Sequence, residues 1–191
     1  MSRLVLASRS PQRRAILAAL GLAFAVRPSA FEECERGDAR EVALANALGK
    51  ALAVPRAAGE LVLGVDTVVS LDGVLWGKAA DEAGARATLR ALSGRTHTVV
   101  SGVALVGDGA SQTGVAATEV SFRALSGPEI EWYLAGGEWR ERAGAYAIQG
   151  AGCALVAGID GDWTNVVGLP VATLLQLLPG LLAQHCRQGD G

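Results

Sequence analysis

The chain has 191 residues, of which 50% are hydrophobic, and this length suits a single domain over residues 1–191 with a buried core. Its 17 basic and 19 acidic side chains give a net charge of -2, which excludes a global positive field for binding nucleic acid or an anionic membrane. We therefore expect no nucleic acid partner and no membrane partner, and a polyanionic ligand must be bound by a local cluster.

The cysteine content restricts the cellular compartment. Cys34, Cys153 and Cys186 are odd in number and widely spaced, which argues against a disulfide framework and a cysteine-rich zinc site. The apolar stretch at residues 4–7 is far too short for the core of a signal peptide. We therefore expect a cytoplasmic protein. Because the chain has only two histidines, a metal would have to be held by carboxylates.

The first predicted elements are a strand, a loop and a helix. Residues 4–7 are apolar and suit a buried strand, and a polar turn follows them. Ser10 suits the N-cap of a helix, Pro11 its first position and Gly21 its end. We therefore expect a helix from Pro11 to about Gly21.

Two adjacent arginines lie in the first turn of this helix, where the helix dipole disfavours cations. A phosphate there would bind backbone N–H groups, the hydroxyls of Ser8 and Ser10, and the guanidinium groups of Arg13 and Arg14. Alternatively, Ser10 only caps the helix and both arginines are solvated. The residues themselves leave these two interpretations open.

A second helix is expected over residues 39–53. Leu44, Leu48 and Leu52 recur every four residues and predict its apolar face, which places Lys50 on the opposite face. A lone lysine is usually solvated. Because the chain has only two lysines, however, both are candidates for a functional role.

Residues 61–71 predict a buried strand whose apolar run has a polar break at Gly64, Asp66 and Thr67. A carboxylate in such an apolar run is costly unless it meets a strand end, a metal or a cation. Asp66 either holds a divalent cation, accepts a proton from an attacking water, or hydrogen-bonds a nearby turn. Glu32, Glu33 and Glu35 form an acidic cluster of a kind found more often in surface loops than in metal sites.

The rest of the chain alternates predicted helices and strands. The expected elements are a helix over 81–92 with Asp81 as its N-cap, strands over 97–106 and 113–123, a helix over 126–135 with Ser126 as its N-cap, a strand over 153–159 and a buried helix within 169–183 that ends near Pro179. This mixed order, without repeats or linkers, predicts an α/β fold.

Three common nucleotide and hydrolase motifs are excluded. Gly77 and Lys78 lack the spacing and the terminal Ser or Thr of a P-loop. Residues 150–155 do not complete a dinucleotide fingerprint, and the chain contains no G-x-S-x-G elbow.

Taken in order, several segments of this chain resemble the Maf family of nucleotide pyrophosphatases. They are residues 6–14, 64–69, 77–78, 92–97, 143–150 and 165–170. The resemblance implies an α/β fold with a mixed sheet, flanking helices and two lobes around a deep cleft, often as a homodimer. It also implies a nucleoside triphosphate substrate, hydrolysed between its α and β phosphates to a nucleoside monophosphate and pyrophosphate.

The resemblance also implies roles for individual residues. Arg13 would bind phosphate, and Lys50 and Lys78 would neutralise charge on the triphosphate. Asp66 would accept a proton from the attacking water, with Glu33 as a second carboxylate. Asp66 and Glu33 would hold Mg²⁺ or Mn²⁺, with the substrate phosphates completing the coordination.

Three positions bear on the choice of base. Thr67 and Gln149 match the branch of the family that acts on dTTP and UTP, whereas Gln12 stands where that branch has arginine. The 7-methyl-GTP branch has neither the Thr nor the Gln. A carboxamide such as Gln149 can donate to one edge atom of uracil and accept from the next. We therefore expect a pyrimidine substrate.

Two alternatives remain at this stage. One is a nucleotide-binding module that regulates cell division without turnover. The other is a house-cleaning pyrophosphatase for ITP or 7-methyl-GTP. Turnover of the substrate distinguishes an enzyme from a binding module. The preferred base, measured on a panel of nucleotides, distinguishes a dTTP and UTP pyrophosphatase from a house-cleaning enzyme.

Overall fold

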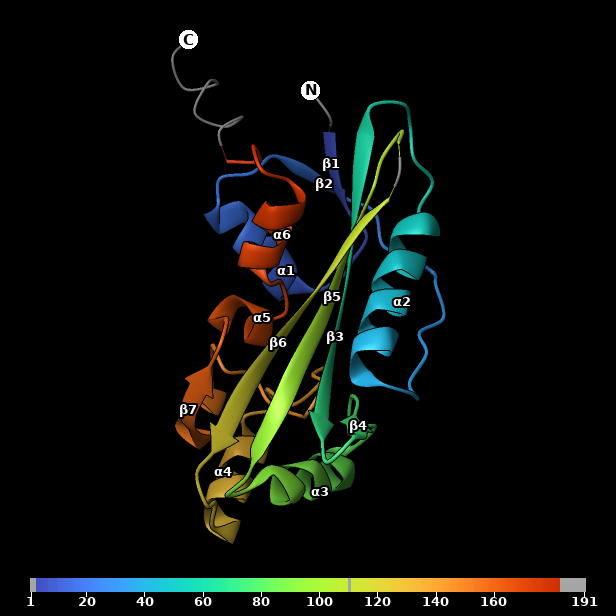
Figure 1. The fold of residues 1–191 in the computed structure, drawn as a ribbon. Coiled ribbons are helices and arrows are strands. Elements are labelled where there is room, and N and C mark those ends of the chain that lie inside the picture. Colours follow the sequence, from blue (N-terminus) through green and yellow to red (C-terminus); the bar gives the residue numbers. More distant parts are fainter. Residues whose placement is uncertain (1–2, 110, 183–191) are drawn as a thin grey trace.

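The computed structural model describes residues 3–109 and 111–182 (Figure 1). Seven strands of this part form one mixed sheet in the order β2-β1-β3-β5-β6-β7, with β4 paired to β3. The strands are β1 (Arg3–Leu6), β2 (Phe24–Val26), β3 (Glu60–Leu71), β4 (Val74–Trp76), β5 (Thr96–Val106), β6 (Gln112–Phe122) and β7 (Val156–Asp160). The helices are α1 (Pro11–Ala19), α2 (Ala39–Leu52), α3 (Glu82–Leu92), α4 (Gly127–Ala135), the 3₁₀ helix η1 (Ala151–Leu155), α5 (Trp163–Val167) and α6 (Val171–Leu177).

The helices cover the sheet in two lobes that share β3, β5 and β6 (Figure 1). In the upper lobe α2 packs on one face of the sheet, while α1, α5 and α6 lie on the other. In the lower lobe α3 and α4 pack together at the far ends of the long strands. These features confirm the expected α/β fold with a mixed sheet and flanking helices. No helix in the described part of the chain is both long and apolar enough to cross a membrane.

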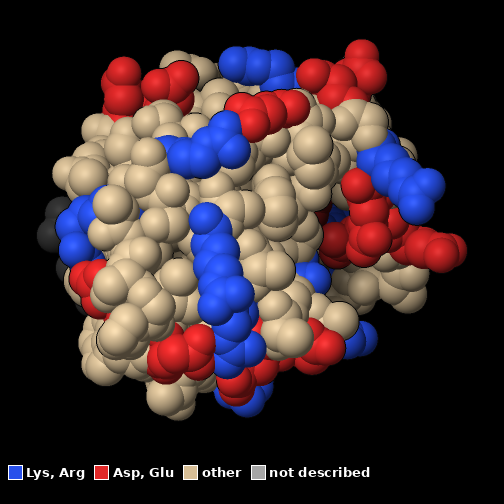
Figure 2. All heavy atoms as spheres, turned by 90° about the horizontal axis from the view of Figure 1, so that it is seen from below, with Lys and Arg blue, Asp and Glu red and all other residues tan. Residues whose placement is uncertain are grey.

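Charged side chains are spread over the surface of the lower lobe. Figure 2 shows basic and acidic groups interspersed on this face, and no single sign dominates it. This agrees with the nearly balanced totals of 17 basic and 19 acidic residues.

Small residues let α2 lie unusually close to the sheet. A Cβ atom on Gly64 would lie 2.1 Å from the carbonyl oxygen of Ala47, and one on Gly102 would lie 2.2 Å from that of Ala43. Three of the six buried residues of α2 are alanines, and its buried face also includes Lys50, whereas Leu52 is 62% exposed. The predicted leucine stripe is thus wrong, and Lys50 lies on the sheet side of the helix.

Strand β3 runs without interruption through its polar residues. Asp66 pairs with Gly102 of β5 and Thr67 pairs with Ser101, in one continuous antiparallel register. The predicted strand over 61–71 is therefore confirmed, and its polar residues do not interrupt it, because both side chains find polar partners and the backbone has no reason to leave the ladder.

Most predicted ends of elements agree with the structure. The predicted N-caps are confirmed for α1, α3 and α4, whose cap residues are Ser10, Asp81 and Ser126. The strands β2 and β4 were not predicted, since three residues carry too little alternation to be recognised.

The segment before β7 differs from the expected strand over 153–159. Residues Ala151–Leu155 coil into a 3₁₀ helix, and only Val156–Asp160 are extended. The turn is tight, because a Cβ on Gly152 would lie 2.5 Å from the Ala147 carbonyl oxygen. After β7, a break at Gly168, whose φ is 123°, separates α5 from α6.

The last predicted helix is shorter than expected. Helix α6 covers Val171–Leu177, starts after Pro170 and ends before Pro179. Residue 183 of the predicted range lies outside the described residues.

Candidate active site

The candidate residues meet at a gap along one edge of β3. Strand β1 pairs with β3 only as far as Leu63, and β4 begins to pair at Val69. Between them, residues 64–68 have no strand neighbour on this edge within the described chain. Asp66 and Thr67 lie at this gap, and because successive side chains of a strand alternate, they point to opposite faces of the sheet.

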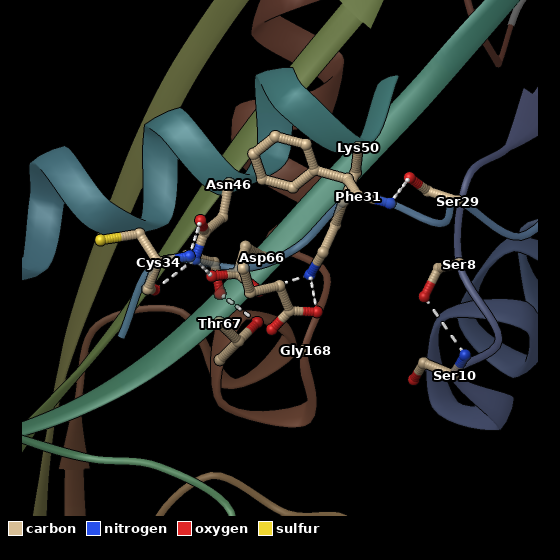
Figure 3. A network of polar contacts seen from close by, with 12 residues as sticks. Ser8, Ser10, Ser29, Phe31, Cys34, Asn46, Lys50, Asp66, Thr67 and Gly168 are labelled. Carbon is tan, nitrogen blue, oxygen red and sulfur yellow. Dashed lines mark hydrogen bonds and ion pairs between the residues drawn. The ribbon is translucent and has the colours of Figure 1, made fainter. Parts of the chain in front are cut away.

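On the α2 face, Lys50 is shared between two carboxylates (Figure 3). Its Nζ lies 2.6 Å from Oδ1 of Asp66 and 2.7 Å from Oε1 of Glu33. Lys50 is 8% exposed and Asp66 is 4% exposed, whereas Glu33 remains partly open to solvent. The buried carboxylate of Asp66 is therefore compensated by a cation rather than by a strand end.

Asn46 completes the contacts of Asp66. Its Nδ2 donates to Oδ2 of Asp66 at 2.9 Å and to the carbonyl oxygen of Cys34 at 2.9 Å. Its Oδ1 accepts from the backbone N–H of Cys34 at 2.8 Å. Each carboxylate oxygen of Asp66 thus has a donor from α2.

On the opposite face, the guanidinium of Arg13 is bound by three oxygens. Nη1 donates to Ser8 Oγ at 3.0 Å, Nη2 to Thr67 Oγ1 at 3.2 Å and Nε to the carbonyl oxygen of Gly168 at 2.8 Å. Arg13 is thus buried at the gap, whereas Arg14 is exposed. The sequence left open whether these arginines were solvated. In the structure Arg13 is not solvated, whereas Arg14 is.

Arg13 and the two carboxylates lie close enough to interact electrostatically. Burial lowers the pKa of Arg13 from its ordinary value, and the charges of Asp66 and Glu33 oppose this shift. The α1 end and the α2 cluster therefore meet at one place on β3, from the two faces of the sheet. The position of Asp66 differs in one respect from the expectation of a strand end, because it lies in the middle of β3.

Thr67 is itself oriented by a buried neighbour. Its hydroxyl lies 2.8 Å from that of Ser101 on β5, which is fully buried. Because Thr67 also accepts from Arg13, the three side chains form a continuous chain of hydrogen bonds from β5 to α1.

Several predicted site residues lie outside these contacts. Lys78 is more than half exposed, and its Nζ lies 3.4 Å from Glu141. Gln149 is exposed. Ser10 caps α1 and donates its hydroxyl to the Gln12 side chain at 3.1 Å. In the described chain, neither Lys78 nor Gln149 hydrogen-bonds to the Asp66 or Arg13 side chains.

One hollow of the described surface lies away from these residues. It has a volume of about 580 Å³, opens on the α2 side of the lower sheet, and is lined in part by Ser70, Thr98 and Glu119. The candidate site is better identified by its buried charges than by this hollow, because chemistry on a phosphate needs cations and a base.

A divalent metal fits the carboxylates that already share a cation. Asp66 and Glu33 both direct an oxygen to the Lys50 ammonium, and hard oxygens are the ligands that Mg²⁺ and Mn²⁺ prefer. Among the described residues, no group of three or more His, Cys, Asp or Glu side chains could hold a metal. A metal here would therefore need further oxygens from a substrate.

Two residues of this site were missed by sequence reasoning. Asn46 lies one helical turn before Lys50, so its spacing from a candidate lysine was the only available signal. Ser101 lies in a predicted strand among valines and small residues and gave no signal at all.

Known proteins similar to this chain identify its family. A family model described as Maf-like protein matches residues 3–181. A dTTP/UTP pyrophosphatase of Gloeobacter violaceus is 48% identical, with 92% of this chain and 94% of that protein covered. The proteins of the same name from Moorella thermoacetica and Deinococcus radiodurans are 49% and 43% identical, covering 93% of this chain and 94% and 92% of their own lengths. The chain therefore belongs to the Maf-like protein family.

Proposed function

We propose that this protein hydrolyses dTTP and UTP between the α and β phosphates, releasing the nucleoside monophosphate and pyrophosphate. The observation that carries the proposal is the meeting of Arg13 with the Asp66, Lys50 and Glu33 cluster at one gap in the sheet. The names of its relatives, which match nearly the whole chain, supply the substrates.

The proposed chemistry assigns phosphate binding to the α1 side. Arg13 and Ser8, which already hydrogen-bond each other, offer a guanidinium and a hydroxyl to phosphate oxygens. Ser10 and Arg14 lie at the same helix end and extend this surface. Lys78 pairs with Glu141 and contacts neither Arg13 nor Asp66, so its side chain would have to move toward the triphosphate to neutralise charge there.

The proposed chemistry assigns proton transfer to Asp66. Its carboxylate accepts a proton from the water whose oxygen forms the new bond to the α-phosphorus, while the bond to the β-phosphate oxygen breaks. Lys50 neutralises charge beside it. Asp66 and Glu33 would hold Mg²⁺ or Mn²⁺, which when bound neutralises charge on the phosphates.

The proposed base selection rests on three side chains. Thr67 lies at the gap, and Gln149 offers a carboxamide that is exposed and therefore available to a ligand. Gln12 stands close to the same helix end and hydrogen-bonds Ser10. We also propose that the protein acts in the cytoplasm, as its cysteine content and its short N-terminal apolar stretch suggest, and that it forms a homodimer, as the family resemblance implies.

The test is a substrate panel with identified products. Purified protein with Mg²⁺ or Mn²⁺ is given UTP, dTTP, CTP, ITP or 7-methyl-GTP, and products are separated by ion-exchange chromatography. We expect UMP or dTMP with pyrophosphate. Asp66→Asn should lower kcat by about 100-fold or more, because it removes the proton acceptor.

Asp108→Asn is the matched control, because Asp108 is an exposed carboxylate that pairs with Arg56 and hydrogen-bonds none of the proposed site residues. Its rate should equal that of the wild type. Orthophosphate as the product would refute the proposal. Faster turnover of ITP would select the house-cleaning alternative, and tight binding without turnover would select the regulatory one.

A further inference from the structure

The amide of Asn46 joins the two carboxylates of the proposed site. It hydrogen-bonds Asp66 directly, and it binds the backbone of Cys34, the residue after Glu33 (Figure 3). Asn46 is 1% exposed, so its polar atoms depend on these protein partners. The proposed reaction assigns no role to Asn46.

The orientation of this amide is determined by its neighbours. The backbone N–H of Cys34 can only donate, so it requires Oδ1 of Asn46, and the Cys34 carbonyl requires one N–H of Nδ2. The second N–H of Nδ2 is then directed at Oδ2 of Asp66. A flipped amide would place an oxygen against both the Cys34 carbonyl and the Asp66 carboxylate, which have only acceptors to offer.

This arrangement restricts the Asp66 carboxylate at both oxygens. Lys50 binds Oδ1 at 2.6 Å and Asn46 binds Oδ2 at 2.9 Å, and both residues come from the same face of α2. Rotation of the carboxylate would break both contacts at once. The Cys34 contacts simultaneously hold the neighbouring Glu33 near Lys50.

We propose that Asn46 is a positioning residue that orients Asp66 through its amide N–H and anchors the segment carrying Glu33 through Cys34. The proposal rests on the proposed function, because it assigns Asn46 an effect on the step in which Asp66 accepts a proton. Binding of the nucleotide, which is assigned to the α1 side, should depend on Asn46 much less.

Two variants separate the two contacts. Asn46→Leu removes every hydrogen bond at nearly the same volume. Asn46→Asp keeps an acceptor for the Cys34 N–H, but it loses the donor to the Cys34 carbonyl and replaces the donor to Asp66 with a like charge. We expect both to lower kcat by about 10- to 100-fold, the range for loss of a residue that orients a functional group, with KM changed less than about threefold.

Hydrogen exchange supplies a second measurement that does not require turnover. The Cys34 amide should exchange faster in Asn46→Leu, which lacks its acceptor, and should stay protected in Asn46→Asp. Val42→Ala is the matched control, because it truncates a buried residue of the same helix that makes none of the hydrogen bonds to Asp66. All rates are measured at a temperature where circular dichroism shows each variant fully folded.

The outcomes distinguish this proposal from the proposed function. If either folded variant keeps wild-type kcat within about twofold, Asn46 does not orient Asp66 and the proposal is overturned. If Val42→Ala loses kcat equally, the effect is general loosening of α2, which also overturns it. If wild-type protein releases no pyrophosphate, the proposed function fails, while unchanged Cys34 exchange in Asn46→Leu would refute the anchoring by itself.

Discussion

Asp66 and Lys50 form the most buried ion pair among the described residues, with side-chain exposures of 6% and 10%. Two charges removed from water cost free energy that their attraction offsets only while both are present. Asn46 contributes a further donor, and Glu33 brings a second negative charge from the partly exposed side. The pair therefore has a role in the proposed chemistry, and breaking it should also lower the free energy of unfolding.

Removing the cation should be costly at this position. Lys50→Met keeps the length of the side chain but leaves Asp66 buried without its charge partner. We expect the free energy of unfolding to fall by about 3 kcal/mol, the lower end of the range for a broken buried pair. Adding Asp66→Asn to Lys50→Met should restore part of this loss. Urea denaturation followed by circular dichroism measures both effects.

Lys78→Met provides the comparison, since Lys78 is the other lysine of the chain and its side chain is 55% exposed. An exposed pair contributes little, so we expect a change within about 0.5 kcal/mol. Equal losses for the two lysine variants would contradict the special position of Lys50.

At the scale of elements, the site depends on the close approach of α2 to β3 and β5. Gly64 and Gly102 leave room for the backbone of α2, and the alanines of the helix fill the remaining space. This approach brings the side chains of Asn46 and Lys50 within hydrogen-bond distance of Asp66. Moving the helix away from the sheet would therefore weaken the contacts of Asp66 with α2.

Gly102→Ala tests this approach. The new Cβ would lie 2.2 Å from the Ala43 carbonyl oxygen, so α2 must move away from the sheet. We expect a loss of stability of about 1 to 3 kcal/mol, as for other overpacked cores, and a fall in the rate of pyrophosphate release. Thermal unfolding and the UTP assay measure the two effects.

The control is Gly158→Ala on β7, where a Cβ would meet no atom within 4 Å. It should change stability by no more than about 0.5 kcal/mol and leave the rate intact. If Gly102→Ala behaved like this control, the close packing of α2 would not be what positions the site.

At the scale of the whole molecule, the two lobes share their longest strands. Val69 and Val99 belong to the lower core, while Leu63 and Val103, on the same two strands, belong to the upper core between the sheet and α1. Unfolding of either core would disrupt β3 and β5, on which the other core also depends. We therefore expect the lobes to unfold together.

The unfolding of the two lobes together can be tested by lowering the pH, because acid should destabilise the lower core through His97. This ring is buried in the lower core beside Tyr146 and Phe122, and burial lowers the pKa of His97 to about 4. Between the unfolded value near 6.5 and pH 4, the unfolded chain binds a proton that the folded chain does not. Stability is therefore complete above about pH 6.5 and falls by up to about 3 kcal/mol as the pH drops to 4.

Urea unfolding at several pH values measures this effect. Tryptophan fluorescence reports mainly Trp76 and Trp139 in the lower core, because Trp132 and Trp163 are already about half exposed in the folded protein, and circular dichroism reports the whole sheet. The two transitions should coincide at each pH. His97→Gln should be less stable at pH 7 but should lose less stability between pH 6.5 and 4. Separate transitions, or a variant with the same pH dependence, would contradict the expectation.

The sequence by itself determined the local structure and the family. Helix starts could be predicted at Ser10, Asp81 and Ser126, because a cap is a contact between near neighbours in the chain. The ordered motifs gave the family and named Arg13 and Asp66 as site residues. Short strands such as β2 escaped prediction, since their pairing partners and not their composition make them strands.

Only the tertiary structure decided how the site is assembled. Lys50 meets Asp66 because glycines in two strands admit α2, and alanines and glycines carry too weak a hydrophobic signal to predict which helix face is buried. The Arg13 side chain hydrogen-bonds the Gly168 carbonyl, 155 residues away in the sequence. Asn46 hydrogen-bonds both Cys34 in the loop before α2 and Asp66 on β3. Such contacts depend on the packing of distant elements, which no local pattern of residues specifies.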